Sequence, residues 1–173
     1  MTASASSRLK DGDDVRLWSR NGRNWSVEFV AITAAVMALP FARVVLDGGA
    51  VAHCPKGLPD FHALLSREGS ARACLYAFDL LHLDCGRPAA AGAHRRALLR
   101  KHLKRAGAAL IYSDGLTGAD GEAMFRHACR MGLEGIVSKG VDSRYKSGRC
   151  LSWVKVKNSG YERRHSPVAA VCS

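Results

Sequence analysis

The stretch LEGIVSKGVDSRYKSGRCLSWVKVKN, residues 133–158, joins two short apolar runs through a basic turn that contains glycine and serine. Short runs rich in Val and Ile, bounded by Gly and Ser, are typical of β-strands. The stretch therefore predicts a strand at Glu134–Ser138, a turn, and a second strand at Leu151–Lys157.

Two lysines in the second strand point to the same face. Lys155 and Lys157 are two residues apart, and side chains two apart on a strand lie on one side of it. Two ammonium groups on one face form a binding site for a phosphate. A solvated strand face is the alternative, and Val154 and Val156 are expected on the core side under either interpretation.

The first strand carries a charge at each end. Glu134 opens a mostly apolar run, where a carboxylate is costly unless it is paired or bound to a metal. Lys139 ends the same strand. A salt bridge to a nearby Lys or Arg is the alternative for Glu134, and a structural ion pair is the alternative for Lys139.

The length and charge of the chain limit its class. It has 173 residues, the size of one domain. Lys and Arg total 26 and Asp and Glu total 15, a net charge of +11. This excess suggests a polyanionic partner such as nucleic acid or nucleotide phosphate, and a generally basic surface is the alternative.

The cysteines and the hydropathy indicate location. Six cysteines occur without C-x-x-C spacing, which argues against a zinc ribbon. No apolar run reaches the roughly 18 residues that span a membrane. The sequence therefore predicts a cytoplasmic protein whose thiols stay reduced, with no membrane partner.

Periodicity and turn residues predict an α+β fold with mostly antiparallel sheet. Residues 1–7 are small and polar and are expected to be disordered, and the tail at 159–173 shows no periodicity. The expected elements are a hairpin over 8–26 with its turn at Asp11-Gly12, a helix over 27–40, a strand, turn and strand over 42–54 with the corner at 47–49, a short helix opening near Pro59, a strand over 73–84, a basic helix over 93–106, a strand over 109–114 and a helix over 118–132.

Five short motifs follow one another along the chain: SRNG (19–22), LDGG (46–49), YAFDLL (76–81), LEGIVSK (133–139) and WVKVK (153–157). In this order they resemble the nucleotidyltransferase (adenylation) domain of ATP-dependent DNA ligases, especially the bacterial ligases linked to end joining. The resemblance covers residues 8–158. It implies an ATP-grasp-like fold of two antiparallel sheets flanked by helices, with ATP between them. The parent reaction seals nicks through enzyme-AMP and DNA-adenylate, in DNA repair and recombination.

The resemblance also assigns roles to the motif residues. It implies that Lys155 and Lys157 contact the α-phosphate of ATP, and that Glu134 helps to hold Mg²⁺. Lys139 lies near the nucleotide, and Arg20 reaches the ribose and phosphates. Phe78 stacks on adenine, and Asp79 orients neighbouring groups.

Several of these residues have simpler interpretations when they are taken alone. A Phe in an apolar strand, such as Phe78, is usually a core residue, and Arg20 reads as an exposed arginine beside a turn. Basic side chains in the turn DSRYKSGR are candidates for contact with the DNA backbone, and so is the helix over 93–106, for which a solvated face is the alternative. The predicted DNA-binding residues are Arg144, Lys146 and Arg149.

The chain departs from the ligase pattern at the nucleophile. Ligases carry their lysine in K-x-D-G, whereas this chain has Leu9-Lys10-Asp11-Gly12, with Leu9 at the lysine position. Lys10 is an unlikely substitute, because Lys10-Asp11-Gly12 reads as the turn of the following hairpin. Gly49 also stands where the family has the glutamate of LDGE, and the tail has no room for an OB-fold domain.

These departures predict a partial adenylation domain, incomplete at its N-terminus, that cannot adenylate itself. A non-catalytic nucleic-acid-binding remnant of a ligase is the alternative. A nucleotidyltransferase for RNA ends or capping is a third interpretation, which a preference for RNA nicks or GTP would reveal.

Overall fold

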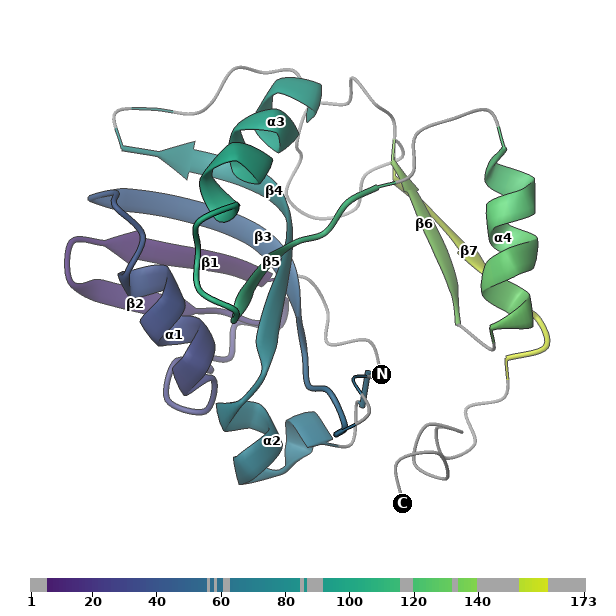
Figure 1. The fold of residues 1–173 in the computed structure, drawn as a ribbon, viewed down its shortest axis with the longest axis horizontal. Coiled ribbons are helices and arrows are strands. Elements are labelled where there is room, and N and C mark those ends of the chain that lie inside the picture. The colour runs from purple at the N-terminus through teal and green to yellow at the C-terminus, as the bar shows by residue number, and fades with distance from the viewer. Residues whose placement is uncertain are drawn as a thin grey trace.

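The computed structural model describes residues 6–55, 57, 59–60, 63–84, 86, 92–115, 120–131, 134–139 and 153–161, and the side chains from Leu9 onward. Helices and strands alternate irregularly, as predicted for an α+β fold (Figure 1). The elements are β1 (Ser6–Asp11), β2 (Asp14–Leu17), α1 (Val30–Met37), β3 (Arg43–Val51), the 3-10 turn η1 (Ala63–Leu65), α2 (Arg67–Ala71), β4 (Cys74–Leu83), α3 (Gly92–Leu103), β5 (Leu110–Tyr112), α4 (Gly121–Arg130), β6 (Gly135–Lys139) and β7 (Trp153–Lys157).

Two sheets organise these elements. The larger has the strand order β2-β1-β3-β4-β5, and the smaller pairs β6 with β7. All pairs are antiparallel except β4 with β5, which are parallel because α3 carries the chain back between them. Figure 1 shows the smaller sheet and α4 beside the larger sheet, with α3 over β4. The predicted class is confirmed, with one parallel pair that the sequence did not indicate.

The N-terminal hairpin forms at the predicted turn. Strands β1 and β2 pair from Arg8↔Leu17 to Asp11↔Asp14. Gly12 closes the turn at φ +60°, a conformation that glycine adopts without steric cost. Strand β1 begins at Ser6, so two residues of the segment that was expected to be disordered belong to the sheet, and residues 1–5 lie outside the described chain.

The prediction of a corner at 47–49 was wrong. Strand β3 runs without interruption from Arg43 to Val51. A Cβ on Gly48 would lie 2.6 Å from the carbonyl oxygen of Tyr76 on β4. Here glycine therefore permits two backbones to approach closely rather than turning the chain. The short helix also begins later than Pro59, with Ser66 as the N-cap of α2.

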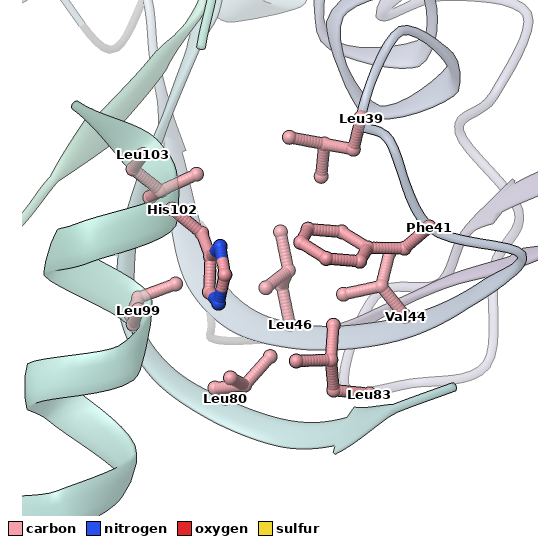
Figure 2. Close-up of a pocket in the computed structure, with 9 residues that line it drawn as sticks. All are labelled: Leu39, Phe41, Val44, Leu46, Leu80, Leu83, Leu99, His102 and Leu103. Carbon is pink, nitrogen blue, oxygen red and sulfur yellow. The ribbon is translucent and has the colours of Figure 1, made fainter. Parts of the chain in front are cut away.

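The core fills the space between the larger sheet and its helices. Its fully buried large side chains include Leu17, Ile32, Leu46, Leu75, Leu80 and Leu99. Figure 2 shows a cavity under α3, enclosed by leucines, Val44, Phe41 and His102. Its volume is about 10 Å³, which is room for one water at most. We conclude that this cavity is a small packing defect and not a ligand site.

The expectation that Val154 and Val156 face a core was also wrong. They are 53% and 36% exposed. Helix α4 packs against β6 (Figure 1), and the described residues leave the valine face of β7 open to solvent. The prediction that the lysines and the valines of WVKVK lie on opposite faces of the strand was correct. Which face is covered depends on distant elements that the sequence of the strand does not specify.

The cysteines only partly follow the expectation of reduced thiols. Cys74 and Cys129 are free, but Cys54 is disulfide-bonded. Within the described chain, no helix has the length and hydropathy needed to cross a membrane.

Candidate functional site

A bulge in β4 directs Phe78 toward the smaller sheet. The pairing of β3 with β4 steps from Asp47↔Asp79 to Gly48↔Ala77, so Phe78 is an extra residue on β4. A bulge of this kind re-aims the side chain it carries. The Phe78 ring meets Trp153 of β7 edge to face, with ring centroids 6.2 Å apart. The two sheets therefore make contact through Phe78.

Lys139 lies between the two aromatic rings. Its Nζ is 3.4 Å from the centroid of Phe78 and 4.1 Å from that of Trp153. Such a cation gains electrostatic attraction from both ring faces. We call Phe78, Lys139 and Trp153 the inter-sheet cluster. The alternative expected for Lys139 was a structural ion pair, but in the structure its ammonium group contacts two aromatic rings.

Burial, together with nearby charged groups, determines the pKa of Lys139. Burial is the largest effect and lowers the pKa of Lys139 to about 8, Asp47 and Asp79 oppose it, and Arg96 adds to it. Asp47 and Asp79 are themselves buried. An amine in this position loses its proton far more readily than an ordinary lysine.

The stability of the protein should therefore depend on pH through Lys139. The folded-state pKa lies below the ordinary value of 10.5, so between about pH 8 and 10.5 the unfolded chain binds more protons than the folded chain. Stability from this group then rises with pH across that window and is constant below it. Urea unfolding of the wild type and of Lys139→Met from pH 6.5 to 10.5 measures the difference, in which other titrating groups cancel. A difference that stays flat or falls above pH 8 would contradict the prediction.

The two phosphate-binding candidates share the face of β7 that carries Trp153. Trp153, Lys155 and Lys157 alternate along the strand, and Lys157 lies opposite Gly135 on β6. The predicted common face of the lysines is thus next to the inter-sheet cluster. Basic groups can bind the phosphates of a nucleotide, and an aromatic ring can stack on its base.

Glu134 forms an ion pair with one of these lysines. Lys155 Nζ donates to Glu134 Oε1 at 2.7 Å, and both side chains are partly exposed. The salt bridge that the sequence left as the alternative for Glu134 is therefore present in this structure. The pair keeps both groups at the junction of β6 and β7.

Glu134 is the carboxylate that was predicted to help to hold Mg²⁺. No group of three His, Cys, Asp or Glu side chains that could hold an ion occurs in the described parts of the chain. A magnesium ion commonly uses one or two protein carboxylates, with phosphates and water as its other ligands. Glu134 fits this partial role, and no all-protein metal site is indicated.

The remaining predicted site residues are Arg20 and the basic residues of the turn DSRYKSGR. Arg20 is exposed in the turn that follows β2, where Ser19 N donates to the carbonyl of Arg23 at 2.8 Å. Among the described residues, no contact joins Arg20 to the cluster. The predicted DNA-binding residues Arg144, Lys146 and Arg149 lie outside the described chain.

Lys10 is committed to a structural role. It is 7% exposed, and its Nζ donates to the carbonyls of Met37 at 2.6 Å and Leu39 at 2.7 Å. The Met37 carbonyl is at the C-terminal end of α1, where a cation is favourable, and the Leu39 carbonyl, just beyond it, also accepts from the N–H of Phe41.

Sequence reasoning missed Arg95. It was grouped with basic residues expected to face solvent or DNA, but it is 6% exposed. Its Nε donates to Asp79 Oδ1 at 2.9 Å, and its Nη2 donates to Oδ2 at 3.0 Å. A signal was present, since Arg95 stands four residues before Leu99 and so shares its apolar stripe. The buried strand residue Asp79 also required a partner.

Comparison with known proteins identifies relatives over most of the chain. Residues 7–157 match the family model described as ATP dependent DNA ligase domain. Over 151 residues the chain is 38% identical to the multifunctional non-homologous end joining protein LigD of Mycobacterium bovis, covering 86% of this chain and 19% of that protein. A probable DNA ligase of Sorangium cellulosum is 37% identical over 166 residues, covering 87% of this chain and 30% of that protein.

Solved structures show the same fold. The ligase domain of LigD from M. tuberculosis superposes with a TM-score of 0.71 at 37% identity, covering 88% of this chain and 51% of that one. A mycobacterial DNA ligase D complexed with ATP and MES gives 0.70 at 34% identity, covering 91% and 52%. The chain thus spans about half of the solved ligase domains and about a fifth of the LigD proteins. The predicted nucleotidyltransferase fold is confirmed.

Proposed function

Because this chain belongs to the ATP-dependent DNA ligase family, we propose that it binds ATP at the inter-sheet cluster and nicked or broken duplex DNA through Arg144, Lys146 and Arg149. Residues 8–158 form the part of the ligase adenylation domain that carries these sites. The biological setting is the repair and recombination of DNA.

One observation carries the proposal. Phe78 meets Trp153 and Lys139, and Lys155 and Lys157 follow on the same strand face as Trp153. Adenine stacks on Phe78 in place of the Lys139 ammonium, and the phosphates lie against Lys155 and Lys157. Base stacking on an aromatic ring and charge-assisted bonds to phosphate are the strongest contacts that such residues can give.

Glu134 is the residue that would hold Mg²⁺, through its carboxylate. The ion would neutralise charge on the phosphates. Lys155 would then turn from Glu134 to a phosphate oxygen. This exchange replaces a partly exposed ion pair, which is itself worth little.

We also propose that this chain does not adenylate itself. Self-adenylation needs a lysine amine that attacks the α-phosphate and displaces pyrophosphate. The K-x-D-G motif is absent from the 173 residues, and Lys10 is held at the end of α1. Nothing in these contacts brings the Lys10 amine toward the proposed phosphate site.

Two measurements on the purified chain test this function. Equilibrium dialysis with radiolabelled ATP is expected to show binding that Phe78→Ala weakens about fivefold or more, since stacking is worth about 1–3 kcal/mol per base. Intact mass after incubation with ATP and Mg²⁺ is expected to show no added AMP. Absence of ATP binding would overturn the site, and a gain of one AMP would overturn the proposed inactivity and make Lys10 the first residue to substitute.

The net charge of +11 favours one further candidate, a nucleic-acid-binding module without nucleotide chemistry. Binding of nicked duplex that weakens steeply with salt, by a chain that does not bind ATP, would support that module instead.

A further inference from the structure

The residue after Phe78 is locked in place by a buried ion pair. Asp79 Oδ1 accepts from the backbone N–H of Leu80 at 2.9 Å and from Arg95 Nε at 2.9 Å. Its Oδ2 accepts from Arg95 Nη2 at 3.0 Å. Both side chains are only 7% exposed. The bulge in β4 is thus fastened to α3 by a two-pronged contact.

The two-pronged contact between Arg95 and Asp79 has a different effect from that of a single charge. A guanidinium fork fixes the orientation of a carboxylate, whereas an ammonium group acts as a point charge. Burying two charges carries a desolvation cost, which well-packed apolar residues would avoid. A buried Arg–Asp fork is therefore weak evidence for added stability. It is better suited to holding one backbone geometry.

The Arg95–Asp79 pair holds the backbone at Phe78. Strand β4 carries the extra residue at Phe78, and Asp79 is the next residue along the chain. Rotation of Asp79 would change the direction in which the bulge points the Phe78 ring. Without that direction, the ring would lose its contacts with Lys139 and Trp153.

We infer that Arg95 is a positioning residue for nucleotide binding: through Asp79, it holds the β4 bulge so that Phe78 faces the site of the base. The inference rests on the proposed ATP site. It assigns Arg95 to the base-binding half of that site, and not to the half formed by Lys155 and Lys157.

The test compares ATP with inorganic tripolyphosphate, which has the phosphates but no base. Arg95→Lys keeps the charge and removes the fork. We expect ATP affinity to fall about tenfold while tripolyphosphate affinity stays within twofold of the wild type. Arg72→Lys is the matched control, because Arg72 forms an exposed pair with Glu68, and it should change neither affinity.

A double-mutant cycle separates positioning from general damage. In a Phe78→Ala background, Arg95→Lys should cause no further loss of ATP affinity, because its effect passes through that ring. Asp79→Asn, which keeps the side-chain shape, should reproduce the loss of ATP affinity alone. Each variant is compared at a temperature where its circular dichroism matches the wild type.

Each outcome decides the inference. Equal losses for ATP and tripolyphosphate, unchanged ATP affinity, or failure of both Arg95→Lys and Asp79→Asn to fold would overturn it and leave the pair a purely structural role. Wild-type protein that binds neither probe would overturn the proposed ATP site together with the inference. If the wild-type protein binds ATP and Arg95→Lys binds it with the same affinity, the inference about Arg95 is overturned while the proposed ATP site stands.

Discussion

Replacing Asp79 with alanine is expected to destabilise the protein by about 3–5 kcal/mol, the cost of removing one partner of a buried charge pair. The substitution leaves the buried Arg95 guanidinium without the carboxylate that accepts two of its N–H groups. It also removes the acceptor for the backbone N–H of Leu80. Urea unfolding at pH 7, followed by circular dichroism, measures the change.

A surface pair provides the control for this prediction. Glu68 of α2 and its C-cap residue Arg72 make an exposed ion pair. Exposed pairs of this kind are worth about 0.3–0.5 kcal/mol, so Glu68→Ala should cost no more than that. A loss below about 1 kcal/mol for Asp79→Ala would show that the Arg95 guanidinium is re-solvated easily and is not truly buried.

Single replacement of Lys155 or Lys157 by methionine is expected to weaken ATP binding by about 10- to 100-fold. Each lysine is proposed to donate to a phosphate oxygen, and hydrogen bonds to charged groups contribute about 1.5–3 kcal/mol. Tripolyphosphate binding should fall by the same factor, because the lost contact involves no base. Equilibrium dialysis with both probes distinguishes this result from the one expected for Arg95.

Arg16→Met is the matched control for the lysine variants. It also removes one positive charge from a strand, where Arg16 pairs with Asp14 on the surface. It should change ATP affinity by less than about twofold, since only long-range charge is lost and salt screens it. If Arg16→Met weakened binding as much as Lys155→Met, net charge would explain the effect and the assignment of Lys155 would fail.

The parts of the fold that local sequence determines were predicted well. Asp11-Gly12 places a tight turn by backbone preference, and alternation places Lys155 and Lys157 on one face. Local sequence does not distinguish a glycine in a turn from a glycine that lets two strands approach closely. The sequence therefore predicted a corner at Gly48, where β3 in fact continues.

The geometry that the sequence did not predict depends on pairing between distant segments. The resemblance predicted Phe78 as a site residue, but the bulge that directs its ring follows only from the register of β3 and β4. Arg95 reads as one of many basic residues on a helix until α3 is placed over Asp79. Covering a strand face is equally non-local, which is why Val154 was expected to be buried. The motif order identified the family without any of these details.

The contact of Lys139 with two aromatic rings has a thermodynamic consequence for ligand binding. When a base displaces the ammonium group from Phe78 and Trp153, Lys139 moves to water or phosphate, and its pKa returns from about 8 toward its usual 10.5. At pH 8 the protein should then take up about half a proton from the buffer for each ATP bound. The heat of binding should accordingly vary with the ionisation enthalpy of the buffer at pH 8. Through this one amine, occupancy of the site is coupled to the proton concentration of the surrounding solution.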